Sequence, residues 1–256
     1  MTDDGFVPGL PVDLIRAAYA AAPGNEIESG KFFSPESSAA LVANAFGFFL
    51  GRPAMLPPIP GSEREGWPAL SIQLEAIVRF PWSGGRHPCL DVLIATKGEL
   101  LGVESKRFEP FRKKTVGDLS DAYWRPVWGD RMRGYESVRD ALREGTLVFS
   151  HLDAAQLVKH AFGLRTAVQA TARYAGRRAV LIYLFAEPEK WPDGRTILPS
   201  DRAAHRNEIA EFARRVAKDE VAFVSCSYRD LLETWKAGAK SLVRAHAVAI
   251  EQRFAP

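Results

Sequence analysis

The spacing of hydrophobic and polar residues changes twice along the chain, from helical to alternating and back. Residues 11–22 and 34–51 have helical spacing, with Ser34 as the expected N-cap and Pro35 as the first helical residue of the second segment. Residues 70–80 alternate between apolar and polar positions, which is the period of a half-buried strand. Residues 1–60 are therefore predicted to be mainly helical, and strands are predicted to follow.

The second half of the chain predicts helices that alternate with strands. The predicted elements, in order, are strands at 90–96 and 100–108, a helix at 153–175 capped by Asp153, a strand at 178–188, a helix at 201–219, a strand at 221–228 and a helix at 228–254 interrupted near Gly238. Three consecutive strands followed by helix–strand units indicate an antiparallel meander that leads into βαβ units. We expect one α/β domain over residues 1–256, with a mixed central sheet flanked by helices.

Composition narrows the class of protein. The chain has 256 residues, 46% hydrophobic and 25% charged, and its net charge is +3. These values are typical of a globular protein, and they leave room for a local basic face. The two cysteines, Cys89 and Cys226, are far apart, which argues against a cysteine-based zinc site or a disulfide framework. No signal peptide or apolar run long enough to span a membrane is evident, so we expect a cytoplasmic protein without a membrane partner.

The predicted hairpin at 89–108 carries charges among mostly apolar residues. If Lys97-Gly98 is a two-residue turn, Asp91 lies opposite Glu104, and Lys106 shares their face of the sheet. Opposed side chains are about 5 Å apart at Cβ, so the two carboxylates repel each other unless a cation lies between them. A three-residue turn would instead place Asp91 opposite Ser105 and remove the shared face.

Two kinds of compensation are open for these charges. A hard divalent ion bound by Asp91 and Glu104 would polarise a phosphodiester and acidify a water molecule, while Lys106 would orient that water or stabilise the developing charge. The alternative is an ordinary salt bridge within the hairpin. The first alternative predicts a hydrolase and the second a structural element.

The segment HPCLDVLIATKGELLGVESK resembles the signature of the PD-(D/E)XK nuclease superfamily, which includes restriction endonucleases and RecB-type exonucleases. Asp91, Glu104 and Lys106 match the motif residues, and Ser105 takes the position whose main-chain carbonyl is usually a metal ligand. Leu90 stands where many members have proline. The resemblance implies a restriction-endonuclease-like core, Mg²⁺ as cofactor with Mn²⁺ as substitute, and DNA as substrate.

Two further positions fit the same resemblance. RecB-type members carry Gln-x-x-x-Tyr on the helix after the motif; here Gln156 matches the glutamine and His160 replaces the tyrosine. Glu75 lies on the preceding strand, where it would be a further metal ligand or an acid–base group, or would pair with Arg79. The long gap between Lys106 and Gln156 makes residues 109–150 an expected insertion.

Basic residues near aromatic residues are candidates for contact with nucleic acid. They are Arg86 and His87 in a Gly-rich turn, and Arg112, Lys113, Lys114 and Arg125 in the expected insertion. The alternative is a solvated loop whose tryptophans pack onto the core. The region of Leu231, Leu232 and Trp235 is expected to be either core or the contact of a homodimer.

The sequence thus favours a Mg²⁺-dependent deoxyribonuclease with Asp91, Glu104, Lys106, Glu75 and Gln156 in its site. A catalytically silent DNA-binding or assembly protein of the same fold is the main alternative. A structural protein whose hairpin charges pair internally is the third.

Overall fold

A five-stranded mixed sheet forms the centre of the molecule. The computed structural model describes residues 5–62, 66–112, 119–238 and 240–256. The strands are β1 (Ser71–Ile77), β2 (Cys89–Ala95), β3 (Glu99–Lys106), β4 (Arg178–Phe185) and β5 (Ala222–Ser227), and they lie side by side in that order. The pairs β1–β2 and β2–β3 are antiparallel, whereas β3–β4 and β4–β5 are parallel. The predicted meander followed by βαβ units is confirmed.

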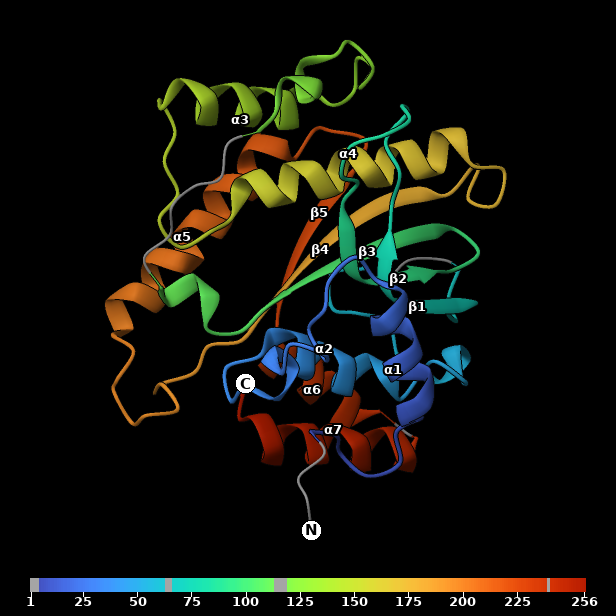
Figure 1. Ribbon diagram of the computed structural model, residues 1–256, viewed down its shortest axis with the longest axis vertical. Helices are drawn as coiled ribbons and strands as arrows, with labels where there is room; N and C mark the ends of the chain where they lie inside the picture. Colours follow the sequence, from blue (N-terminus) through green and yellow to red (C-terminus); the bar gives the residue numbers. More distant parts are fainter. Residues whose placement is uncertain (1–4, 63–65, 113–118, 239) are drawn as a thin grey trace.

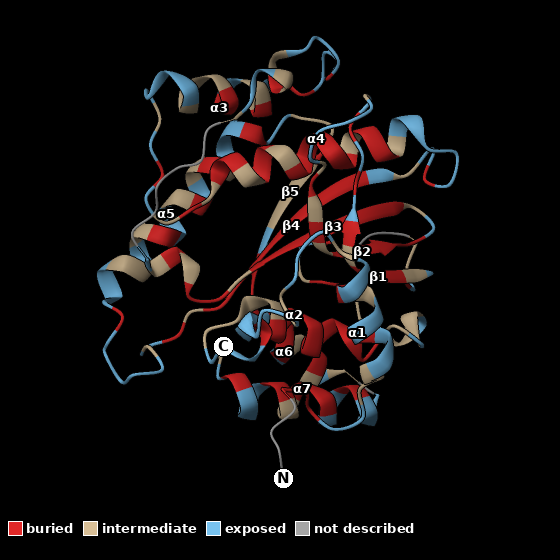
Figure 2. Ribbon diagram, in the orientation of Figure 1, coloured by how far each residue is buried: buried red, intermediate tan, exposed pale blue. Residues whose placement is uncertain are grey.

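Helices cover both faces of the sheet (Figure 1). They are α1 (Val12–Ala21), α2 (Ser38–Gly47), α3 (Arg133–Glu144), α4 (Ala154–Ala170), α5 (Pro199–Val216), α6 (Tyr228–Ala237) and α7 (Ser241–Phe254), and short 3-10 turns occur at Lys31–Phe33, Pro53–Met55, Glu109–Phe111 and Asp121–Trp124. One face carries α1, α2, α6 and α7, and the other carries α3, α4 and α5. Figure 2 shows the buried residues concentrated in the sheet and on the helix sides that face it.

Helix caps explain where two of the helices begin. Asp153 caps α4 as predicted, because its carboxylate accepts the main-chain N–H of Gln156 at 3.0 Å. The predicted start of α2 was wrong: Ser37, not Ser34, accepts the N–H of Ala40 at 3.0 Å. Ser34 is instead engaged in a local turn, where its hydroxyl accepts the N–H of Glu36.

Residues 109–150 contain a helix, α3, that the sequence pattern did not predict. Helix α3 buries Tyr135 and Val138 against the face covered by α4 and α5. Asp219 accepts the N–H groups of Gly134 and Tyr135, at 3.0 and 2.8 Å, and so satisfies donors in the first turn of α3. A residue 85 positions away in the sequence therefore stabilises the start of this helix.

Burial distinguishes the alternatives for two regions that contain tryptophan, the expected insertion and the region around Trp235. The ring of Trp128 stacks on Phe162 of α4, with 4.1 Å between ring centroids, so this part of the expected insertion packs onto the core. Leu231, Leu232 and Trp235 are buried in the core between α2, α6 and α7. Burial therefore favours core over a dimer contact for this region.

The strand alternation predicted for residues 70–80 breaks at Glu75. Ile72 and Leu74 belong to the core on the α2 side, but Ala76 and Val78 belong to the core on the α4 side. Glu75 has φ +50°, a left-handed conformation that costs free energy for a residue with a side chain. Regular strand geometry would have kept all four apolar residues on one face.

The hairpin of β2 and β3 has the register predicted for a two-residue turn. The pairs run from Ala95–Leu100 to Val92–Val103, and Thr96 donates its N–H to the carbonyl of Glu99 at 2.9 Å. Continuing this register places Asp91 opposite Glu104. The alternative three-residue turn is excluded.

A close approach between α4 and β3 depends on Gly102. A Cβ at this position would lie 2.7 Å from a methyl of Leu90 and 2.8 Å from a methyl of Leu164. This contact brings α4 near enough to the sheet for its side chains to reach the charged end of β3.

We expect Gly102→Ala to lower the free energy of unfolding by about 1–3 kcal/mol, because the added methyl overpacks this contact. Gly51→Ala is the matched control: no atom lies within 4 Å of a Cβ there, and its effect should stay within about 0.5 kcal/mol. Urea denaturation followed by circular dichroism measures both. Equal stability of the two variants would contradict the packing argument.

Candidate active site

Three carboxylates lie in a row across neighbouring strands. Glu75 and Asp91 both lie between the β1–β2 pairs Leu74–Val92 and Ala76–Leu90. Asp91 and Glu104 are the residues next to the last β2–β3 pair, Val92–Val103. Asp91 also lies where β2 changes faces, since Leu90 packs on the α4 side and Val92 on the α2 side. The row therefore forms where two strands lose their regular alternation.

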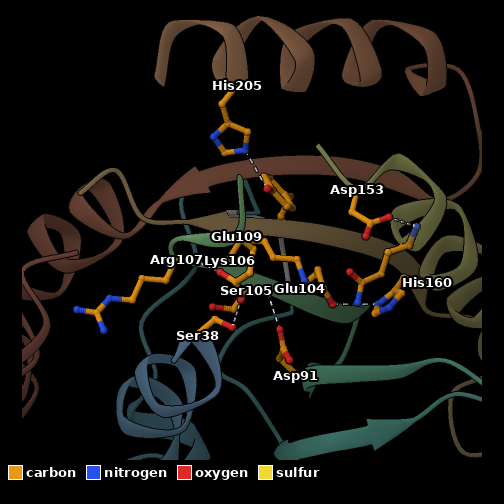
Figure 3. Close-up of polar contacts among 12 residues, drawn as sticks. Ser38, Asp91, Glu104, Ser105, Lys106, Arg107, Glu109, Asp153, His160 and His205 are labelled. Carbon is orange, nitrogen blue, oxygen red and sulfur yellow. Dashed lines mark hydrogen bonds and ion pairs between the residues drawn. The ribbon is translucent and has the colours of Figure 1, made fainter. Parts of the chain in front are cut away.

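Asp91 is held by the main chain of β3. Its Oδ2 accepts the N–H of Ser105 at 2.6 Å, as Figure 3 shows. Burial, followed by the negative charge of Glu104, holds the pKa of Asp91 well above its usual range, and Lys106 only partly opposes this. Without a further cation, the ionised form of Asp91 is thus disfavoured.

Lys106 supplies the positive charge next to this row. Its Nζ forms an ion pair with Oε1 of Glu104, and the two side chains are 13% and 2% exposed. Burial alone would lower the pKa of Lys106, but the charges of Glu104 and Asp91 outweigh it, and the pKa is raised. Lys106 is therefore a protonated ammonium that can orient a water molecule or stabilise negative charge, but cannot accept a proton.

His160 of α4 approaches Glu104 from the other side. Its Nδ1 lies 3.5 Å from Oε2 of Glu104 (Figure 3). Both atoms are buried and neither has a hydrogen-bond partner among the residues that the structure describes. Burial lowers the pKa of His160, so the ring is neutral at neutral pH. The structure thus places His160, which replaces the tyrosine of the motif, against the candidate site.

Glu75 occupies the outer end of the row. Its Oε2 lies 3.6 Å from the Sγ of Cys89. Tyr19, whose hydroxyl donates to the carbonyl of Ala39 at 3.0 Å, is a further neighbour. Burial raises the pKa of Glu75, and the charge of Glu104 adds to the rise. No ion pair with Arg79 is found in the described ranges, so the proposed Glu75–Arg79 salt bridge is not formed.

Gln156 lies one helical turn before His160 on α4. Its main-chain N–H binds the cap residue Asp153. Within the described chain, no hydrogen bond joins its side chain to Asp91, Glu104 or Lys106. Its role in the site remains a prediction.

The donor set fits a hard divalent cation. Among the described residues, Glu104 Oε2 is a buried acceptor without a hydrogen-bond donor. Burial and the neighbouring charge of Glu104 raise the pKa values of Asp91 and Glu75. Among the described residues, however, no three side chains of His, Cys, Asp or Glu are already gathered as a ready-made metal cage. The side chains of Asp91 and Glu104, completed by the Ser105 carbonyl and water, are oxygen donors of the type that Mg²⁺ accepts.

The predicted nucleic-acid contacts lie at several places. Arg86 is exposed in the loop between β1 and β2, and the Nδ1 of His87 accepts the N–H of Phe80 at 3.1 Å. Arg125 is exposed and lies over the ring of Trp82, 4.8 Å from its centroid. Arg112 forms an ion pair with Glu36. Lys113 and Lys114 lie outside the described residues.

Several neighbours of the site had no signal in the sequence. Tyr228 of α6 shares a hydrogen bond of 2.7 Å with the hydroxyl of Ser105. Glu109 accepts the N–H of Arg107 at 2.8 Å and the hydroxyl of Ser38 at the start of α2. These contacts join residues that are up to 123 positions apart, so only the folded chain reveals them.

Comparison of the chain with protein-family models, with curated proteins and with solved structures finds no match. In the described part of the chain, no helix has the length and apolar character needed to cross a membrane. The case for a function therefore rests on the motif residues and the geometry around them.

We expect Asp91→Asn to stabilise the metal-free protein increasingly as the pH rises. The native state keeps the Asp91 proton to a higher pH than the unfolded chain does, so wild-type stability falls as the pH rises above 3.8 and through the folded pKa. Asparagine does not titrate and still accepts the Ser105 N–H. In EDTA, the melting temperature of Asp91→Asn should exceed that of the wild type by more at about pH 8 than at about pH 5. Each kcal/mol of difference in stability corresponds to roughly 2–4 °C.

Asp121→Asn is the control for this experiment, since Asp121 is 89% exposed. Its melting temperature should follow that of the wild type at both pH values. A constant gap between Asp91→Asn and wild type would show that Asp91 ionises normally and would contradict the crowding of charge.

Proposed function

We propose that this protein is a metal-dependent nuclease that hydrolyses phosphodiester bonds in DNA. The observation that carries the proposal is the convergence of Glu75, Asp91 and Glu104 from three neighbouring strands, next to the ammonium group of Lys106, which pairs with Glu104. Negative charge in excess of positive charge at a poorly hydrated place favours binding of a cation. The match of Asp91, Glu104 and Lys106 to the PD-(D/E)XK signature supports the same reading, as do the strand order and the helices on both faces.

The residues of the chain have separate tasks in this proposal. Asp91 and Glu104 hold the cation, with the Ser105 carbonyl as a third oxygen. A bound Mg²⁺ would polarise the phosphate and acidify a water molecule. Lys106, kept protonated by its carboxylate neighbours, stabilises the negative charge that develops on the phosphate oxygens.

His160 has a positioning task. Its neutral ring lies 3.5 Å from the Glu104 oxygen that Lys106 does not bind. A small approach would complete a hydrogen bond from Nδ1–H to this oxygen and fix the carboxylate. Gln156, on the same helix face, is proposed to assist from the rim of the site.

The rival reading is that the charges compensate one another internally. Lys106 already pairs with Glu104, and Ser105 already donates to Asp91. In that case the protein would bind DNA without metal, as a silent DNA-binding or assembly protein, or would have a purely structural hairpin. Two experiments distinguish these alternatives.

The first experiment is a cleavage assay on single-stranded, double-stranded and branched DNA. We expect cleavage with Mg²⁺ and none in EDTA. Asp91→Ala and Lys106→Ala should each reduce the rate by at least about 100-fold. Asp121→Ala and Lys218→Ala, which change exposed residues elsewhere, should retain wild-type rates. Cleavage that survives both site substitutions, with circular dichroism unchanged, would remove the assignment.

The second experiment is calorimetric titration with Mn²⁺. The wild type should bind the ion, and its affinity should rise with pH, because the cation competes with the proton for the Asp91 carboxylate, whose pKa is raised. Asp91→Ala should lose this binding, while Asp121→Ala should keep it. Absence of binding to the wild type would favour internal pairing of the charges.

A further inference from the structure

A cavity opens at the same end of the sheet as the candidate site. It has a volume of about 830 Å³ and lies between residues 32–35, the end of β3, the loop 187–192 after β4 and the end of α7. Cavities of about 300–1,000 Å³ are the usual size for small-molecule ligands. Figure 3 shows Arg107, which lines this cavity, pointing away from Glu104 and His160. The cavity is therefore distinct from the proposed metal site. The two sites are adjacent along the chain, because Glu104 on β3 belongs to the metal site and Arg107, just after β3, lines the cavity.

Arg107 is a buried cation that forms no ion pair with a carboxylate of the described residues. The residue is 8% exposed, and its guanidinium donates to the carbonyls of Pro35 and Phe254, each at 2.6 Å. The Nε of Arg107 has no hydrogen-bond partner within the described ranges. The nearby carboxylate of Glu109 is occupied by the hydroxyl of Ser38 and by the main-chain N–H of Arg107.

The cavity lining carries more positive than negative charge. Besides Arg107 it contains Lys190, Arg229 and Arg253. Two of its glutamates are already neutralised: Glu187 pairs with Arg206, and Glu251 pairs with Lys236. Of the three lining glutamates, this leaves Glu189 to oppose the four basic side chains. No ion pair joins Lys190 or Arg229 to a carboxylate in the part of the chain that the structure describes.

Flat aromatic surface accompanies this charge. Phe33 is 45% exposed and lines the cavity, which is unusual for a ring of its size. The guanidinium carbon of Arg107 lies 5.0 Å from the ring centroid of Phe108 and 5.2 Å from that of Phe254. Phe33 can therefore stack on a planar ring, while the cations bind an anionic group.

We propose that this cavity binds a nucleotide, with its phosphate near Arg107 and Arg229 and its base against Phe33. The ligand can come from two sources, a free nucleoside monophosphate or the terminal nucleotide of a nucleic-acid strand. The proposal stands on the cavity alone and does not depend on phosphodiester cleavage at Asp91.

The test is calorimetric titration of the full chain in EDTA with dAMP, deoxyadenosine and inorganic phosphate. The protein should bind dAMP at least about tenfold more tightly than either fragment, because only dAMP uses both the cations and the ring. Arg229→Ala should weaken dAMP binding about tenfold. Phe33→Ala should weaken dAMP binding about tenfold and leave phosphate binding unchanged. Both altered residues are exposed, so the variants should fold.

Two controls separate this proposal from the nuclease assignment. Arg214→Ala, at an exposed position of α5, should bind dAMP as the wild type does. Asp91→Ala should also keep dAMP binding, because EDTA already excludes the metal site from the measurement. Competition between dAMP and an oligonucleotide with a 5′-phosphate would identify the strand end as the source, whereas binding of dAMP without competition would identify the free nucleotide.

Absence of dAMP binding to the wild type would overturn the proposal. So would dAMP binding that Arg229→Ala and Phe33→Ala leave unchanged. DNA cleavage without dAMP binding would retain the proposed function and reject the nucleotide cavity. Binding of dAMP without DNA cleavage would retain the nucleotide cavity and reject the proposed function.

Discussion

Mutual repulsion of carboxylates at one end of the sheet is the constraint around which the site is organised. Glu75, Asp91 and Glu104 come from three adjacent strands, and Lys106 is the cation paired with them. Burial weakens the solvation of every charge in this row, so each negative group raises the cost of ionising the next. The raised pKa values of Asp91 and Glu75, and that of Lys106, are consequences of this single arrangement. A divalent cation would relieve this repulsion, and the repulsion is therefore the physical basis of the proposed nuclease function.

The backbone creates this crowding by departing from regular strand geometry. Strand β1 changes faces at Glu75, whose φ is positive, and β2 changes faces at Asp91. In an unbroken strand, alternate residues point to opposite faces, and the apolar neighbours would dictate the direction of each carboxylate. The irregularity frees these side chains from the core pattern. Strain of this kind is tolerated where the surrounding packing holds it, and it concentrates at functional sites.

The close fit of α4 against the sheet completes the arrangement. Gly102 on β3 and Gly163 on α4 have no room for a Cβ, so helix and strands approach more closely than larger residues would permit. This proximity brings the His160 ring to Glu104. At the same end of the sheet, Arg107 points away from His160 (Figure 3) and connects the end of β3 to Pro35 and to the last turn of α7. One short segment of chain thus contributes to two separate polar environments.

Local sequence patterns were sufficient for the antiparallel meander of β1, β2 and β3, the β2–β3 register and the cap of α4, because each depends on residues close together in the chain. The two-residue turn at Lys97-Gly98 determines which residue faces Asp91, and Asp153 needs only the next turn of helix. Helix α3, the break at Glu75 and the contact of His160 with Glu104 were decided by tertiary structure. The start of α3 depends on Asp219. The break at Glu75 depends on packing against both faces of the sheet. The His160–Glu104 contact depends on α4, which is far from the motif in the sequence. Such contacts form between distant segments, whose meeting no local periodicity encodes.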